Sequence, residues 1–374
     1  MMSERGVQRL LGSVPVDEQA ARRAWEIVRA AYAEREPRRS RRRRSSVALV
    51  LAAVAAAAAA AVLSPPGRAV VNAVRRSIGI EHAQPALFRL PAPGRLLVAG
   101  GSGAWIVADD GSKRRLGDYP QASWSPHALY VVAAAANELA AVEPTGRVHW
   151  TLARPQIRFP RWGGTRSDTR IAYFTAGRLH IVAGDGTGDV AAQGLAAAAP
   201  VPPAWEPTTG DRHVLAYVTA RGRVTVLDAD SGNVQWVSAA YAGPRALAWS
   251  PDGTQLALAA KTRVIVFDAR TGHATAIRAG GVRALAFAPD GQLALLRSHE
   301  VLLRAGGLLH TLFVPPGGRL SGLVWSPDSR WLLTELPAAD EWVFLQVRGG
   351  RRILAVSHIA AQFGAFPSLS GWAS

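Results

Sequence analysis

The chain has 374 residues with 43 basic and 27 acidic side chains, a formal net charge of +16. A hydrophobic fraction of 49% with only 19% charged residues excludes a chain that is disordered throughout. The absence of cysteine excludes a disulfide scaffold and cysteine-based metal or iron–sulfur sites. Nearly all basic residues are Arg, which together with the abundant Ala indicates a GC-rich coding bias, so the charge is weak evidence for a nucleic-acid partner.

Residues 17–36 predict an amphipathic helix. Ala21, Trp25, Val28 and Tyr32 recur at spacings of four, three and four, which places them on one helical face. One interpretation is a short solvated helix. The other is a docking helix on which Trp25, Val28 and Tyr32 contact a partner, because a segment this short cannot build its own core.

An apolar run at residues 47–63 predicts a single membrane-spanning helix. It has 17 residues without a charge, and six arginines come shortly before it: Arg38, Arg39, Arg41, Arg42, Arg43 and Arg44. At about 1.5 Å per residue the run measures roughly 25 Å, slightly short of a hydrocarbon core. Because arginines collect on the cytoplasmic flank of a span, we expect residues 1–46 in the cytoplasm and the rest outside.

Two alternatives for this region are a cleaved signal peptide, which needs a shorter leading segment, and a twin-arginine export signal, whose apolar residue after the arginines is missing. Nucleic-acid binding by the arginine run is a third interpretation, but the adjoining apolar stretch favours a role in topology. Residues 64–89 are expected to form a juxtamembrane helix on the headgroups or a linker to the next domain.

From residue 90 onward, short alternating apolar runs separated by Gly, Pro, Asp and Asn indicate β-strands and turns. One unit recurs clearly at 245–260, 283–296 and 322–334, as in RALAWSPDGTQLALAA, and more weakly at 122–134, 160–175 and 203–218. Each copy joins a strand ending in a large aromatic, a Pro-Asp-Gly-type turn and a returning strand. A second turn, as in DADSG at 228–232, separates two more strands. Four antiparallel strands in about forty residues is the period of a β-propeller blade.

The large aromatics of these copies, here called the marker aromatics, are Trp124, Trp162, Trp205, Trp249, Phe287, Trp325 and Trp372. Their fixed place in the repeat predicts packing between neighbouring blades and not a sugar-stacking set. Trp372 has no strands after it to complete a blade, whereas residues 95–117 offer three strands without a leading one. We therefore expect an all-β, seven-bladed propeller over residues 90–374, closed by its N- and C-terminal strands; six or eight blades are the alternatives.

The WSPDG-type repeats resemble the WD40-like, PD40-type repeats of TolB and related bacterial propellers over roughly three-quarters of the chain. The second turns, as in VTVLDADSGNVQW at 224–236, also look like those of quinoprotein-type propellers. The sequence lacks the Trp-Asp dipeptide of eukaryotic-style repeats and the adjacent cysteines of many quinoprotein dehydrogenases. The resemblance implies an envelope propeller that contacts other proteins, without a quinone cofactor.

Catalytic motifs are missing from the sequence. The nine histidines form no HxxH, HxH or HExxH cluster, and we expect most of them to be solvated at strand ends or turns. There is no G-x-S-x-G elbow and no P-loop, and the glycine-rich 184–189 and basic 348–352 segments are expected to be hairpin turns. We therefore predict no catalytic, metal or cofactor-binding residues, although ligands from separate blades would leave no local motif.

These patterns predict a bacterial protein of the cytoplasmic membrane with an extracytoplasmic, non-enzymatic binding propeller. Its partner is expected to be a protein, with a small molecule at a propeller face as a further option and nucleic acid not expected. A helix inside and a sensor domain outside also match the layout of transmembrane anti-sigma regulators. The alternatives are a TolB-like envelope scaffold and an enzyme that uses residues of the central channel.

Overall fold

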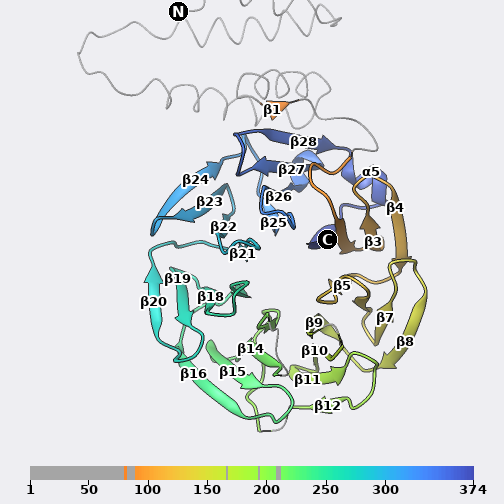
Figure 1. Cartoon of the computed structure of the whole chain (residues 1–374), viewed down its shortest axis with the longest axis vertical. Helices are drawn as coiled ribbons and strands as arrows, with labels where there is room; N and C mark the ends of the chain where they lie inside the picture. Colours follow the sequence, from red (N-terminus) through yellow and green to blue (C-terminus); the bar gives the residue numbers. More distant parts are fainter. Residues whose placement is uncertain (1–79, 82–88, 166, 193, 208–211) are drawn as a thin grey trace, which may run out of the picture. The chain divides into compact units, whose positions relative to one another are not determined.

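The computed structural model describes residues 80–81, 89–165, 167–192, 194–207 and 212–374. In this part of the chain seven sheets are arranged as a ring about a common axis (Figure 1). The prediction of an all-β, seven-bladed propeller is confirmed, and the alternatives of six or eight blades are wrong.

Each sheet is one blade with four antiparallel strands, counted from the axis outward, and the sheet of blade 7 has a fifth strand described below. For blades 1 to 7 in order, the innermost strands are β29 (Ser368–Ala373), β5 (Gln121–Trp124), β9 (Arg158–Gly164), β13 (Ala204–Trp205), β17 (Ala246–Trp249), β21 (Ala284–Phe287) and β25 (Ser321–Trp325). The second strands are β2 (Arg95–Gly100), β6 (Val131–Ala134), β10 (Thr169–Thr175), β14 (Val214–Val218), β18 (Gln255–Ala259), β22 (Leu293–Arg297) and β26 (Trp331–Leu336).

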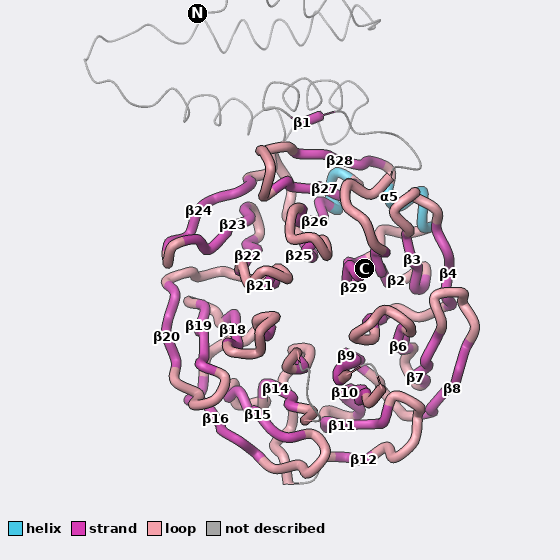
Figure 2. Tube along the Cα trace, in the orientation of Figure 1, coloured by secondary structure: helices cyan, strands magenta, loops and turns pink. Residues whose placement is uncertain are grey.

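The third strands are β3 (Gly103–Val107), β7 (Glu138–Val142), β11 (Arg178–Ala183), β15 (Arg223–Asp228), β19 (Val264–Asp268), β23 (Glu300–Ala305) and β27 (Glu341–Gln346). The outermost strands are β4 (Lys113–Gly117), β8 (Val148–Ala153), β12 (Val190–Ala191), β16 (Val234–Ala240), β20 (Ala274–Ile277), β24 (Leu308–Phe313) and β28 (Ile353–Ser357). Loops join the blades in chain order around the ring (Figure 2).

The antiparallel order gives the ring two faces with different connections. One face, here called the turn face, carries the turn between the first and second strands and the turn between the third and fourth strands of a blade. The opposite face, here called the loop face, carries the connections between the second and third strands and the loops that lead to the next blade. In blade 5 the Ser250 hydroxyl accepts the Gln255 N–H at 2.9 Å, Asp252 accepts the Thr254 N–H at 3.1 Å, and Gly253 has φ of 70°. Side-chain acceptors and a left-handed glycine therefore form the predicted Pro-Asp-Gly turn.

The two ends of the propeller close the ring within blade 1. β29 pairs antiparallel with β2, and Trp372 lies opposite Leu96, which confirms the predicted closure. The short helix α5 (Ile359–Phe363), which the repeats did not predict, lies between β28 and β29 and accounts for the longer spacing before Trp372. Trp372 is 9% exposed and packs edge-on against Phe344 of blade 7, with ring centroids 5.9 Å apart.

A buried carboxylate also crosses from blade 7 to the closing strand. Glu335 of β26 is 2% exposed and accepts hydrogen bonds from the Ser321 hydroxyl and from the Leu369 backbone N–H of β29. Burial raises the pKa of Glu335. A Cβ at Gly322 would lie 2.6 Å from this carboxyl group, so glycine makes room for it.

All seven marker aromatics lie on the innermost strand of their blades. Three of them donate an indole N–H to a carbonyl on the innermost strand of the preceding blade: Trp205 to Arg161 at 2.9 Å, Trp249 to Ala204 at 2.9 Å and Trp325 to Ala286 at 3.1 Å. The carbonyl belongs in each case to the residue just before the preceding marker. Within the described residues, the indole nitrogens of Trp124, Trp162 and Trp372 have no such acceptor.

The N-terminal predictions lie mostly outside the described residues. This holds for the docking helix with Trp25, Val28 and Tyr32, for the arginine run and for the apolar stretch 47–63. Among the residues that are described, none belongs to a helix with the length and apolar character that a membrane crossing needs. Within the expected linker, β1 (Ile80–Glu81) pairs in parallel with β28 as a fifth strand of blade 7, which the sequence did not predict.

Candidate functional site: an aromatic pocket between blades 2 and 3

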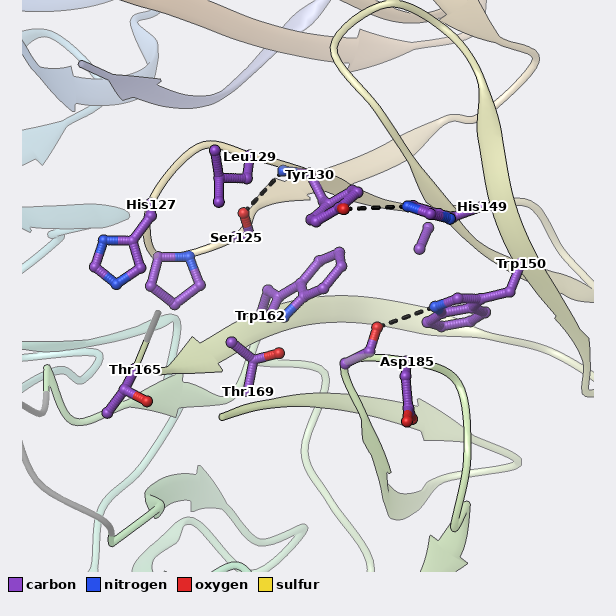
Figure 3. A pocket seen from close by; sticks show the side chains of 13 residues that line it. Ser125, His127, Leu129, Tyr130, His149, Trp150, Trp162, Thr165, Thr169 and Asp185 are labelled. Carbon is purple, nitrogen blue, oxygen red and sulfur yellow. Dashed lines mark hydrogen bonds between the residues drawn. The ribbon is translucent and has the colours of Figure 1, made fainter. Parts of the chain in front are cut away.

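A pocket of about 450 Å³ opens on the turn face between blades 2 and 3 (Figure 3). Three turns meet here, the one after β5 of blade 2 and those after β9 and β11 of blade 3, together with residues of strands β7 and β8. The side chains used below are Leu129, Tyr130, His149, Trp150, Trp162 and Asp185. Residues far apart in the sequence thus share one wall.

The first turn of blade 2 departs from the repeat where it faces the pocket. His127, Leu129 and Tyr130 occupy the places that Asp252, Thr254 and Gln255 hold in blade 5. Asp252 closes its turn because its carboxylate accepts hydrogen bonds from the N–H and the hydroxyl of Thr254. His127 has no carboxylate at this place. Leu129 is 47% exposed. Blade 2 therefore keeps the turn but replaces its polar rim with imidazole and apolar groups, which the fold itself does not require.

Aromatic rings are held rigidly along this pocket. Tyr130 stacks on Trp162, with ring centroids 6.0 Å apart and planes at 18°. The Tyr130 hydroxyl and His149 Nε2 are 3.1 Å apart. Trp150 donates its indole N–H to the Gly184 carbonyl at 3.0 Å, across the interface between the two blades (Figure 3). The polar groups of Tyr130, His149 and Trp150 are thus engaged within the fold, so aromatic surface is the larger part of what this wall offers to a ligand.

The opposite wall is polar and carries a charge. Asp185 is held by the Thr187 hydroxyl at 2.6 Å and the Thr187 backbone N–H at 2.9 Å, and these hydrogen bonds lower the pKa of Asp185. Glycine shapes this wall, because a Cβ at Gly184 would lie 1.9 Å from the Thr169 hydroxyl oxygen. The pocket thus combines flat apolar surfaces with one carboxylate and hydroxyl groups, which suits a ring that carries hydrogen-bond donors.

A second polar cluster joins blades 3 and 4. The side chain of His213 is fully buried; its Nδ1 lies 2.6 Å from Asp230, and its Nε2 lies 3.2 Å from the Asp168 carbonyl oxygen. Arg170 binds Asp230 at 2.8 Å and also pairs with Asp168. The expectation of a solvated histidine is wrong at His213, because its two ring nitrogens contact Asp230 and the Asp168 carbonyl oxygen and not water. Both nitrogens are engaged, so this cluster ties blades together.

The sequence-predicted residues do not converge on one site. Of the marker aromatics, Trp162 lines the pocket, while the others are distributed around the ring. Over the described ranges, no three His, Asp or Glu side chains come together in a way that could hold a metal ion. The pocket itself was not predicted, although the departure of the SPHALY segment at 125–130 from the WSPDG pattern was a visible signal.

Comparisons with known proteins show the fold alone. No protein-family model and no curated protein matches the chain. Among solved structures, a chain in the crystal structure of the mitotic checkpoint complex has a TM-score of 0.54 and 17% identity, covering 71% of this chain and 95% of that one. The propeller domain of Cps50 (Swd1) from Myceliophteria thermophila has a TM-score of 0.51 and 13% identity, covering 64% and 86%. At these identities both similarities show the propeller fold alone.

Proposed function

We propose that the chain is a membrane-anchored, extracytoplasmic and non-enzymatic propeller that binds a protein partner through the pocket between blades 2 and 3. The observation that carries this proposal is the blade 2 turn, where Leu129 is exposed beside the stacked rings of Tyr130 and Trp162. The structural neighbours support a protein partner, because some of them were solved inside protein complexes. The WSPDG-type repeats support a bacterial, TolB-like origin.

The pocket suits a side chain with a ring as the inserted group. Tyr130, Trp150 and Trp162 line the pocket with aromatic surface, and the carboxylate of Asp185 accepts a hydrogen bond at the opposite wall. A tyrosine, tryptophan or histidine of the partner has both parts, a flat ring and a donor. Anchors of this kind in a pocket carry much of the binding energy of protein interfaces.

A photo-crosslinking amino acid introduced at Leu129 in the full chain tests this site in cells. We expect one discrete crosslinked protein, whose yield falls at least fivefold when Tyr130→Ala is added. The matched control carries the crosslinker at Leu308, which is 67% exposed on β24 of blade 6 and lies away from the pocket. Identical crosslinking patterns at the two positions would contradict a binding role for the pocket.

The proposed topology has its own test. If the arginine run and the apolar stretch 47–63 set the orientation, protease added to intact spheroplasts should digest the propeller and spare residues 1–46. Protection of the propeller would refute the extracytoplasmic location. Inside the cell, residues 1–46 should bind a cytosolic partner such as a sigma factor, and replacing Trp25 and Tyr32 by Ala should abolish its recovery.

A further inference from the structure

Charges are segregated between the two faces of blades 4 and 5. Between residues 212 and 283 the four acidic side chains all lie on the turn face: Asp228, Asp230, Asp252 and Asp268. The same stretch carries seven basic residues on the loop face, here called the basic band: Arg221, Arg223, Arg245, Lys261, Arg263, Arg278 and Arg283. Arg212 and Arg270 are the two basic residues of this stretch on the turn face. A biased composition can raise the number of arginines, but it does not by itself place seven of nine basic residues on the face that has no acids.

The acids are explained by the fold, and the basic band is not. Asp228 and Asp268 each accept a backbone N–H within their turns at 2.8 Å, from Ser231 and Thr271, and these hydrogen bonds contribute to the lowered pKa values of both carboxyl groups. All seven residues of the basic band are exposed, and none of them forms an ion pair with another described residue. The Arg223 guanidinium donates a hydrogen bond to the Ser238 carbonyl at 3.1 Å within its own blade. Charges that no ion pair neutralises and no turn requires point to a role outside the fold.

The basic band is continuous because its loops are hydrogen-bonded to one another. The Tyr241 N–H donates to the Gly222 carbonyl at 2.8 Å, and the Lys261 N–H donates to the Ala242 carbonyl at 3.0 Å. The Gly281 N–H in turn donates to the Lys261 carbonyl at 3.1 Å. Connections from blades 4 and 5 and the loop into blade 6 thus form one rigid surface, which keeps the like charges in place before any partner arrives.

We propose that the basic band binds an acidic polypeptide segment, a stretch of a partner protein rich in Asp and Glu. The band spreads over several loops, which fits an extended anion better than one small ion. Six of its seven residues are Arg, whose planar guanidinium pairs with carboxylates through two parallel hydrogen bonds. This inference rests on the proposed function, because it names the chemistry of a protein partner.

Lipid and nucleic acid fit the basic band less well. The chain enters the propeller on the turn face, where the Leu90 N–H donates to the Asp109 carbonyl at 2.9 Å. The basic band therefore lies on the face opposite the entry of the segment that we expect to lead to the membrane. Tyr241, an aromatic residue of these loops, packs edge-on against Phe267 at 5.9 Å, so its ring is engaged within the fold and does not form a platform for stacked bases.

The test uses the full chain in neutral detergent and a fluorescein-labelled peptide of twenty residues that alternates Glu and Ser. We expect the double variant Arg245→Glu with Arg283→Glu to weaken peptide binding at least tenfold. The matched control reverses the same number of charges on the turn face, Arg212→Glu with Arg270→Glu, and should change the affinity less than twofold. Unchanged circular dichroism and melting temperature identify the variants that have kept the fold.

Each remaining outcome overturns the inference. Equal loss in the two double variants would mean that the peptide responds to net charge and not to the basic band. Tighter binding of a twenty-base-pair DNA duplex, or of phosphatidylglycerol vesicles, that is lost in Arg245→Glu with Arg283→Glu would assign the band to a different partner. If crosslinking from Leu129 persists while the peptide does not bind, only this inference fails. If both are absent, the proposed function fails as well.

Discussion

Closure of the ring can be tested by joining the two strands that meet in blade 1. Ala99 of β2 and Ser368 of β29 are direct register partners, and the chain has no cysteine that could compete. Replacing both with Cys should give a disulfide that links positions about 270 residues apart. A loop of that length corresponds to about 5 to 6 kcal/mol of lost unfolded-state entropy, and engineered bridges typically deliver about 2–4 kcal/mol. We expect a gain in this lower range.

The assay compares urea unfolding of the oxidised and reduced double variant, followed by tryptophan fluorescence. The bridge should form in air, shift the protein on a non-reducing gel, and raise the unfolding midpoint only until reductant is added. The matched control moves the second cysteine to Ser357 on the outermost strand of blade 7, where no register partner of Ala99 lies. Failure of the Ala99–Ser368 pair to bridge, or equal bridging in the control, would refute the closure.

Two further predictions concern contacts between blades. Burial raises the pKa of Glu335 above its ordinary value of 4.5, so the folded state binds the proton more readily than the unfolded chain. The contribution of this group to stability is therefore fully present below about 4.5 and is lost as pH rises through the folded-state pKa. Glu335→Gln should flatten this dependence and raise the urea midpoint at neutral pH, and an unchanged pH profile would contradict it. Phe287→Trp should add an indole N–H directed at the Ala248 carbonyl and stabilise the fold by about 0.5–1.5 kcal/mol in thermal unfolding. A lower melting temperature would show that blade 6 has no room for the larger ring.

The repeats allowed the fold to be predicted because each blade repeats the same local chemistry. Turns such as Ser250–Gly253 are closed by side chains within a few residues, so they are visible in the sequence. The closing strand was predictable because the copy around Trp372 lacked its following strands. The helix α5 was missed because five residues are too short to show a helical period.

The pocket and the buried histidine depend on contacts between residues that lie far apart in the sequence, and a local sequence pattern does not reveal such contacts. Tyr130 and Trp162 stack across two blades, and the copy that contains Trp162 is degenerate. His213 stands at the end of a turn, as most solvated histidines do. Its burial follows from Asp230, a residue of the outer turn on the same face of the blade, and from the Asp168 carbonyl of the neighbouring blade. The period of the repeats predicts the blades, whereas the pocket is formed by side chains that meet between two blades.

The place of β29 in blade 1 has a consequence for how the protein is made. As the chain is synthesised, β2 emerges early and presents an unpaired edge until residues 368–373 arrive. Six blades can form in the meantime, each from neighbouring segments, but the first stays open to pairing with other chains. The open edge of β2 therefore persists until synthesis of the chain is almost complete, and pairing with another chain during that time is the misfolding event that the order of strands favours.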